Sequence, residues 1–279
     1  MNHILHPLSG QVTRLLLLLV CIFSFTACLE DDYDACQTGI CLRFTYLFNS
    51  QYTDLFPTEV NQLEIYVYDR DGKHLFTHSL NNTPDAQPCY LPLPDGGDYR
   101  IVVWGNRDEA HYECSSENRL KDLCIRVIAD SDNVVQEPPC SLFYGSLDFY
   151  VKKYRKVEHT IDLNKNTNRI RVNLVKPDGS SANPSLYGNT LHGSNGSYDH
   201  TNCFVDRRSF QYLPRAPRTL LYNGIESEFT MQRLFCDDEP ITLRMSSEGI
   251  GARTFEYSLV DELLKHPNIN TDDDLERQD

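Results

Sequence analysis

Short runs of alternating apolar and polar residues recur along most of the chain and predict β-strands. In residues 62–68 the alternation places Leu63, Ile65 and Val67 on one face, and Asp71-Gly72 then makes the turn of a hairpin whose second arm is residues 73–78. Residues 99–104 are almost continuously apolar, which predicts a strand buried on both faces. The other predicted strands are residues 41–48, 124–128, 142–151, 159–163, 170–175, 227–233 and 241–245.

Strands of this length with turns between them, and without intervening helices, predict an all-β chain built of antiparallel sandwiches. The basic, polar segment 152–156 suggests a boundary between a first domain, residues 41–155, and a second domain, residues 156–279. Residues 180–202 are rich in Ser, Asn and Gly and predict a loop. The single predicted helix, residues 257–266, has Leu259 and Leu263 on one face and ends at a proline.

The N-terminus has the features of an export signal. Arg14 precedes an uninterrupted apolar run at residues 15–25, which is shorter than the roughly 20 residues that a spanning helix needs. Small residues follow directly, and then Cys28. We therefore expect residues 1–27 to be a lipoprotein signal peptide, Cys28 to carry the lipid, including palmitate-type acyl chains, and residues 28–40 to be an acidic tether. The alternative is an ordinary secretory signal with an incidental cysteine.

Charge and cysteine content narrow the class of protein further. The formal net charge of −14 argues against nucleic-acid binding. Besides Cys21 in the signal and Cys28, eight cysteines remain, and an even number in an exported chain suggests disulfides. Their spacings lack the C-x₂-C pattern of zinc sites, so we expect no metal. We assign no pairing among these candidate disulfide cysteines: Cys36, Cys41, Cys89, Cys114, Cys124, Cys140, Cys203 and Cys236.

The sequence does not contain a recognisable catalytic motif. It has no nucleophile elbow, no H-E-x-x-H and no phosphate-binding glycine loop. His192-Gly193-Ser194 resembles a serine site only superficially, because it lies among turn-forming residues. Trp104 lies within an apolar strand and is expected in the core rather than on a sugar-binding surface. We therefore predict a protein that is not an enzyme and has no cofactor.

An ordered set of segments resembles the Bacteroidales fimbrial anchor family, that is, the FimB-like anchoring subunits. The resemblance rests on residues 42–46, 56–60, 63–73, 91–96, 99–104, 142–145, 164–172, 257–264 and 275–279. It implies two tandem transthyretin-like β-sandwich domains and a lipoprotein of the outer membrane, exposed at the cell surface. It also implies a role in fimbrial anchoring, assembly and length control, with strand addition by a stalk pilin. The acidic tether resembles the surface-export signal of Bacteroidetes lipoproteins.

Two other classes remain open: a surface adhesin that binds glycan or host protein outside a pilus, and an unrecognised hydrolase. Three or four strands and one helix are predicted after residue 156, fewer than a closed two-sheet sandwich needs. The second domain is therefore expected to be incomplete at its C-terminus and less stable than the first. The favoured interpretation is a shortened gene product, and the alternative is a natural variant whose gap is filled by a partner's strand.

Overall fold

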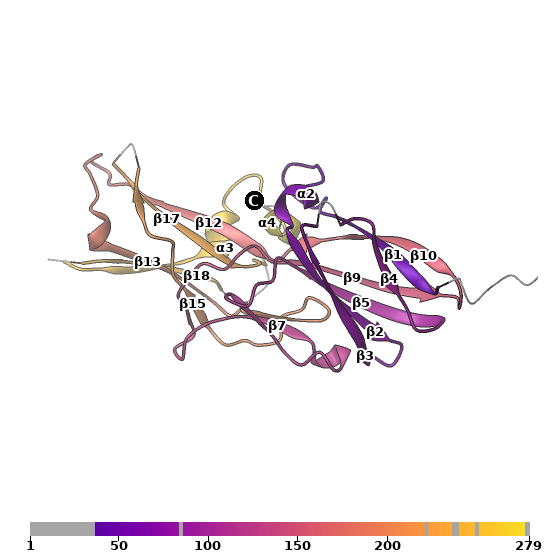
Figure 1. Cartoon of the computed structure of the whole chain (residues 1–279). Helices are drawn as coiled ribbons and strands as arrows, with labels where there is room; N and C mark the ends of the chain where they lie inside the picture. The colour runs from indigo at the N-terminus through magenta and orange to yellow at the C-terminus, as the bar shows by residue number, and fades with distance from the viewer. Residues whose placement is uncertain (1–36, 84–85, 221–222, 236–239, 249–250, 277–279) are drawn as a thin grey trace, which may run out of the picture.

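The computed structural model describes residues 37–83, 86–220, 223–235, 240–248 and 251–276. These residues form an elongated molecule with a pair of sheets at each end and a small sheet containing β7 between them (Figure 1). The prediction of an all-β chain built of sandwiches is confirmed. In the part of the chain that the structure describes, no helix has the length and apolar character needed to cross a membrane.

The first sandwich packs a three-stranded sheet of order β10-β1-β4 against a five-stranded sheet of order β11-β9-β5-β2-β3. β1 pairs with β10 in parallel and with β4 antiparallel. The predicted hairpin is confirmed as β2 and β3, with Gly72 at a φ of 72° in its turn. The strands are β1 (Gly39–Thr45), β2 (Gln62–Asp69), β3 (His74–Asn81), β4 (Cys89–Pro92), β5 (Gly97–Gly105), β9 (Phe143–Val151), β10 (Lys156–Asp162) and β11 (Asn164–Lys165).

The central strands β2 and β5 of the five-stranded sheet are buried on both faces, whereas β9 has exposed outward residues such as Tyr150. On β2, Leu63, Ile65 and Val67 belong to the core shared with the three-stranded sheet, whereas Tyr66 and Tyr68 belong to a second core on the opposite face. β5 follows the same rule, which confirms the prediction of a strand buried on both sides. The residues on the two faces of β5 are Ile101 and Val103 on one, and Val102 and Trp104 on the other.

The second sandwich packs a three-stranded sheet of order β12-β17-β16 against a five-stranded sheet of order β19-β18-β13-β15-β8. The prediction of three or four strands after residue 156 is wrong, because the described residues from there onward form ten strands. The strands of this sandwich are β8 (Val134–Val135), β12 (Thr167–Leu174), β13 (Tyr187–Gly193), β15 (Phe210–Tyr212), β16 (Arg218–Thr219), β17 (Ile225–Gln232), β18 (Thr242–Ser247) and β19 (Thr254–Ser258).

β13 lies in the segment that was predicted to be a loop, and it is the central strand of its sheet. Two glycines near its end explain the error. A Cβ on Gly196 would overlap the ring of Phe210, and a Cβ on Gly193 would lie 2.9 Å from Oδ1 of Asn195. These glycines therefore make room for neighbouring side chains, whereas the sequence alone suggests that they form turns.

Strand pairing crosses the predicted boundary at residues 155/156 in both directions. β10 follows the boundary but pairs with β1, and β8 precedes it but pairs with β15. The small sheet of order β14-β7-β6 also combines strands from both sides. Its strands are β6 (Tyr112–Cys114), β7 (Cys124–Val127) and β14 (Ser197–Asp199).

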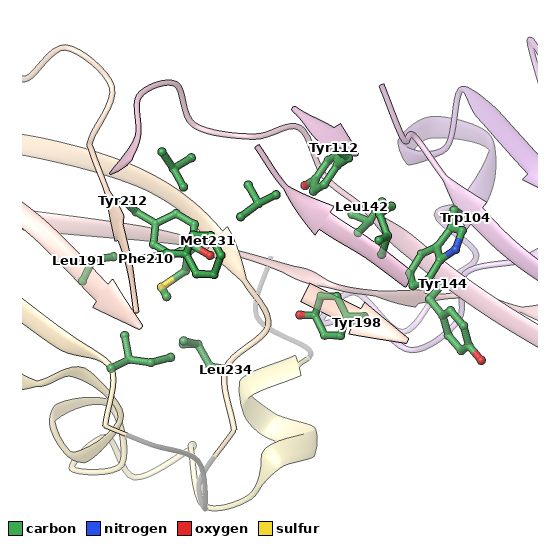
Figure 2. Close-up of a cluster of buried hydrophobic side chains, with 14 of the residues drawn as sticks. Trp104, Tyr112, Leu142, Tyr144, Leu191, Tyr198, Phe210, Tyr212, Met231 and Leu234 are labelled. Atoms are coloured by element: carbon green, nitrogen blue, oxygen red, sulfur yellow. The ribbon is translucent and has the colours of Figure 1, made fainter. Parts of the chain in front are cut away.

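The second core runs without interruption from the first sandwich into the second (Figure 2). At one end, Trp104 and Tyr144 lie with their ring centroids 5.0 Å apart. Tyr198 and Tyr112 line the middle, and Met231 lies in the second sandwich. The two sandwiches therefore share apolar contacts.

The helices are short, with five residues or fewer in each described segment. The predicted helix at residues 257–266 is reduced to α3, because Tyr257 and Ser258 belong to β19. The Ser258 side chain accepts a hydrogen bond from the backbone N–H of Asp261, which caps the helix. The helical segments are α2 (Phe56–Glu59), η2 (Leu120–Asp122), η3 (Pro184–Leu186), α3 (Leu259–Leu263) and α4 (Asp272–Glu276).

Candidate functional site

In the second sandwich, the inward-facing side chains of the five-stranded sheet become more exposed from β13 through β18 to the edge strand β19. Leu191, Leu243 and Tyr257 are cross-strand neighbours on β13, β18 and β19. Leu191 is fully buried, Leu243 is half-buried and Tyr257 is 38% exposed. The next row shows the same gradient, ending with Phe255 at 46% exposure. Two large aromatic side chains on an inward-facing row are therefore left in contact with solvent.

The gradient arises because the opposing sheet is narrower. β12 is its edge on this side: among the described strands it pairs with β17 alone, and the segment after β15 leads to β16 on the other side of β17. Inward-facing residues of β12 lose burial along the strand, from Ile170 at 8% exposure to the half-buried Val172 and Leu174. The β12 edge and the uncovered face of β19 together form what we call the open edge.

Arginine side chains gather on the outer face beside the open edge. Nε atoms of Arg169, Arg171 and Arg215 lie 3.6, 3.3 and 3.8 Å from the carboxylate of Glu228. Each arginine side chain is about half exposed, so each ion pair contributes only about 0–1 kcal/mol. One carboxylate cannot balance three guanidinium groups, and this surface is therefore positive although the chain as a whole is acidic.

The described candidate disulfide cysteines are present as free thiols, at Cys41, Cys89, Cys114, Cys124, Cys140 and Cys203. Cys28, Cys36 and Cys236 lie outside the described residues. Among those described, disulfide formation stays a prediction, but the strand register argues against two pairings.

The register puts neighbouring cysteines on opposite faces of their sheets. Cys89 lies opposite Leu42, whereas Cys41 lies opposite Tyr90, so the two thiols point to different sides of the β1–β4 pair. On β6 and β7, Cys114 lies opposite Ile125, and Cys124 again takes the other face. A disulfide needs Cβ atoms that point toward each other. Bridges between Cys41 and Cys89, or between Cys114 and Cys124, would therefore require backbone shifts.

A different cluster forms where two connecting segments meet beside the second core. Side-chain ligand atoms of Asp108, His111 and Cys140 all lie within 4.8 Å of one another. Burial, and then the neighbouring Asp108, raise the pKa of the Cys140 thiol to about 12. Burial tends to raise the pKa of Asp108 too, but hydrogen bonds from His111 and Cys140 outweigh it and lower that pKa. The cluster could not be predicted from the sequence, since Cys140 is far from Asp108 and His111 along the chain.

The remaining candidate residues have structural surroundings. His192 lies on β13 and forms a 3.0 Å hydrogen bond with Oγ1 of Thr190. Burial and the nearby Arg244 lower the pKa of His192, although Glu256 acts in the opposite direction. Trp104 is fully buried, which confirms the prediction that it belongs to the core.

Two β-sandwiches with a shared core, an open strand edge and a positive surface beside it are features of a subunit that binds other chains. A family model described as "Fimbrillin-A associated anchor proteins Mfa1 and Mfa2" matches residues 33–279. The chain belongs to this family of fimbrial anchor proteins.

Individual relatives agree with this family. The minor fimbrium anchoring subunit Mfa2 of Porphyromonas gingivalis is 26% identical over 260 residues, which cover 86% of this chain and 76% of the relative. The crystal structure of the P. gingivalis fimbrial anchor Mfa2 superposes with a TM-score of 0.71 at 23% identity, covering 87% of this chain and 88% of that one. A Bacteroides thetaiotaomicron protein, described as a candidate polysaccharide-binding protein, gives 0.77 at 21% identity and coverages of 86% and 88%.

Proposed function

We propose that this protein anchors fimbriae at the cell surface and takes part in their assembly and length control. It would be held in the outer membrane by lipid on Cys28, after removal of residues 1–27. The fimbrial anchor family and the apolar run that ends at Cys28 support this proposal. The protein would have no catalytic role: its task is to bind a fimbrial subunit at one site while a lipid holds it at another.

The open edge is the proposed site for the fimbrial subunit. The observation that carries this is the exposure of Phe255 and Tyr257 on an inward-facing row. A pilin strand added beside β12 would extend the narrow sheet over both rings and pair with the backbone groups of that edge, which bond to no other described strand. Its inward residues would be apolar. Its outward residues would be acidic, because they would lie near Arg169 and Arg171.

Tyr257→Glu tests the binding site directly. A charge there should prevent an apolar strand from covering the inner face. The amount of sheared fimbriae that co-purifies with the lipidated protein should therefore be smaller than with wild type. Tyr150→Glu is the matched control, because Tyr150 is 57% exposed on β9 in the first sandwich. Equal recovery of fimbriae with Tyr257→Glu and with wild type would refute the open edge as the binding site.

The lipid anchor has its own test. Cys28→Ser should leave the precursor uncut and unlabelled by radioactive palmitate, whereas Cys203→Ser, at an exposed cysteine, should label normally. Palmitate labelling of Cys28→Ser would contradict the proposal.

An adhesin outside a pilus is the second candidate. A cavity of about 560 Å³ at the end of the first sandwich is lined by Tyr99 and Tyr150 together with Arg100 and Asp148, groups that suit a sugar. A deletion strain distinguishes the two functions. Loss of an anchor should release fimbriae into the medium or change their length, whereas normal attachment and length would favour the adhesin.

A further inference from the structure

Two connecting segments, one between β5 and β6 and one between β8 and β9, bring together side chains of three types that bind metal ions: a carboxylate, an imidazole and a thiol. Asp108 and His111 come from the segment between β5 and β6, and both carboxylate oxygens of Asp108 lie 2.9 Å from Nδ1 of His111. Cys140 comes from the segment before β9, and its Sγ lies 3.0 Å from the backbone oxygen of Asn106. One nitrogen, one carboxylate oxygen and one sulfur therefore lie within 4.8 Å of one another.

The backbone holds this arrangement in place. The N–H groups of Ala110 and His111 donate to Oδ1 of Asp108, at 3.0 and 2.8 Å, and fix the turn. The buried Tyr112 donates its hydroxyl to the backbone oxygen of Cys140 at 2.6 Å. The Asp108 carboxylate lies within hydrogen-bond distance of Nδ1 of His111 and also accepts from the Cys140 thiol, so the three side chains already contact one another.

We propose that Asp108, His111 and Cys140 bind a zinc ion. Zinc accepts nitrogen, oxygen and sulfur ligands together at about 2.0–2.3 Å, which requires ligand atoms roughly 3.3–3.8 Å apart in a tetrahedron. The present cluster needs shifts of no more than about an ångström to reach this geometry. Calcium and magnesium prefer oxygen alone, and copper(I) prefers sulfur, so the mixed set favours zinc.

The ion would complete a brace between the two connecting segments. Water would take the fourth position, because the side chains of His111 and Asp108 are 24% and 37% exposed. Binding releases the thiol proton, and a zinc-bound thiolate would keep Cys140 out of disulfide exchange in an oxidising compartment. This cross-link would hold the two segments in place beside the core that the two sandwiches share.

Cobalt(II) provides a spectroscopic test on the purified full chain after treatment with a chelator. One equivalent of Co²⁺ should give the near-ultraviolet charge-transfer band of a thiolate ligand, and one equivalent of Zn²⁺ should displace it. Cys140→Ser should abolish the band. Asp108→Asn and His111→Gln should weaken cobalt binding at least tenfold.

Cys114→Ser is the matched control, because Cys114 is also half-buried beside the second core but lies outside the cluster. It should keep the band, and circular dichroism should show that every variant is folded. Zn²⁺ should raise the unfolding temperature of wild type and Cys114→Ser but not of Cys140→Ser. A thiolate band that persists in folded Cys140→Ser, or no saturable binding by wild type, would overturn the proposal.

Discussion

The two sandwiches combine the same sheet sizes, three strands against five, with different results. In the first, the strand order is β10-β1-β4, and the inward residues are buried on β1 and β4, including Leu42 and Leu91 at 0% exposure, and on β10 at Ile161, at 3%, although Val157 and His159 of that edge strand are half-buried. In the second, the narrower sheet leaves Phe255 and Tyr257 of the wider one exposed. The same number of strands therefore covers the inner face of the first sandwich more completely than that of the second, where two large aromatic side chains stay exposed.

The sandwiches are nevertheless not independent bodies. Residues of β2, β5 and β9 share one apolar cluster with residues of β13, β15 and β17. A chain with separate domains would bury each core by itself. The two sandwiches thus differ in how well their edges are covered but share one core. The variants below distinguish the contribution of the shared core to stability from that of the β12 edge.

Phe229→Ala should have the largest effect. Phe229 is fully buried in the shared cluster, and removing its ring should cost about 3–5 kcal/mol of unfolding free energy. Because Trp104 lies in the same cluster in the first sandwich, its fluorescence should report the same lower denaturation midpoint as far-UV circular dichroism. Phe255→Ala, at an exposed ring, should change stability by about 0.5 kcal/mol or less. A Trp104 transition that does not move would show that the halves unfold separately.

A pair of leucine variants compares the two sandwiches directly. Leu163→Ala should cost about 2–5 kcal/mol, because Leu163 is fully buried in the first core. Leu174→Ala, at a half-buried position on the β12 edge, should cost less than about 1 kcal/mol. Urea denaturation measures both, and equal losses would show that the β12 edge is covered after all.

Limited proteolysis complements this pair. Leu163 belongs to the core of the first sandwich although it lies beyond residue 155. A protease-resistant fragment of the first sandwich should therefore extend past Leu163. A fragment that ends near residue 155 would support the boundary predicted from the sequence and would argue against the pairing of β10 with β1.

The smallest expected effect concerns pH. Burial and Arg244 lower the pKa of His192 in the folded protein, so below about pH 6.5 the unfolded chain binds a proton more readily. Stability should therefore fall as the pH decreases from about 7.5 to about 5.5. In His192→Gln this fall should be smaller, whereas the exposed His266→Gln should behave like wild type. Urea midpoints at both pH values would measure it, and identical pH dependence in His192→Gln and wild type would contradict the assignment.

Local patterns were sufficient to predict individual strands of the first sandwich. Alternation located β2, an Asp-Gly pair located its hairpin, and a continuous apolar run located β5, because each depends on neighbours along the chain. β13 was missed because Gly193 and Gly196 serve packing against distant residues. β10 pairs with β1 and β8 pairs with β15, in each case across the predicted boundary. These pairings join segments that are distant along the chain, so neighbouring residues do not indicate them.

The candidate sites show the same limit. The resemblance to fimbrial anchors predicted strand addition in general, but the location of the open edge depends on which strand ends each sheet. The Asp108–His111–Cys140 cluster could not be expected from spacing, because Cys140 joins it through the fold. Of its three members only Cys140 was singled out from the sequence, as a candidate disulfide cysteine.

The parallel pairing of β1 with β10 has a mechanical consequence. Seven residue pairs join these strands, from Gly39 beside Lys156 to Thr45 beside Asp162. Under the proposed anchoring at Cys28, a pull on the fimbria would load β1 at its first residue. It would load β10 at its last, where the chain continues into the second sandwich. The two forces act at opposite ends of the ladder, so its hydrogen bonds would be sheared together rather than opened one after another. Rupture would then require the whole ladder to fail at once, which suits the part of an adhesive fibre that bears the load of the cell.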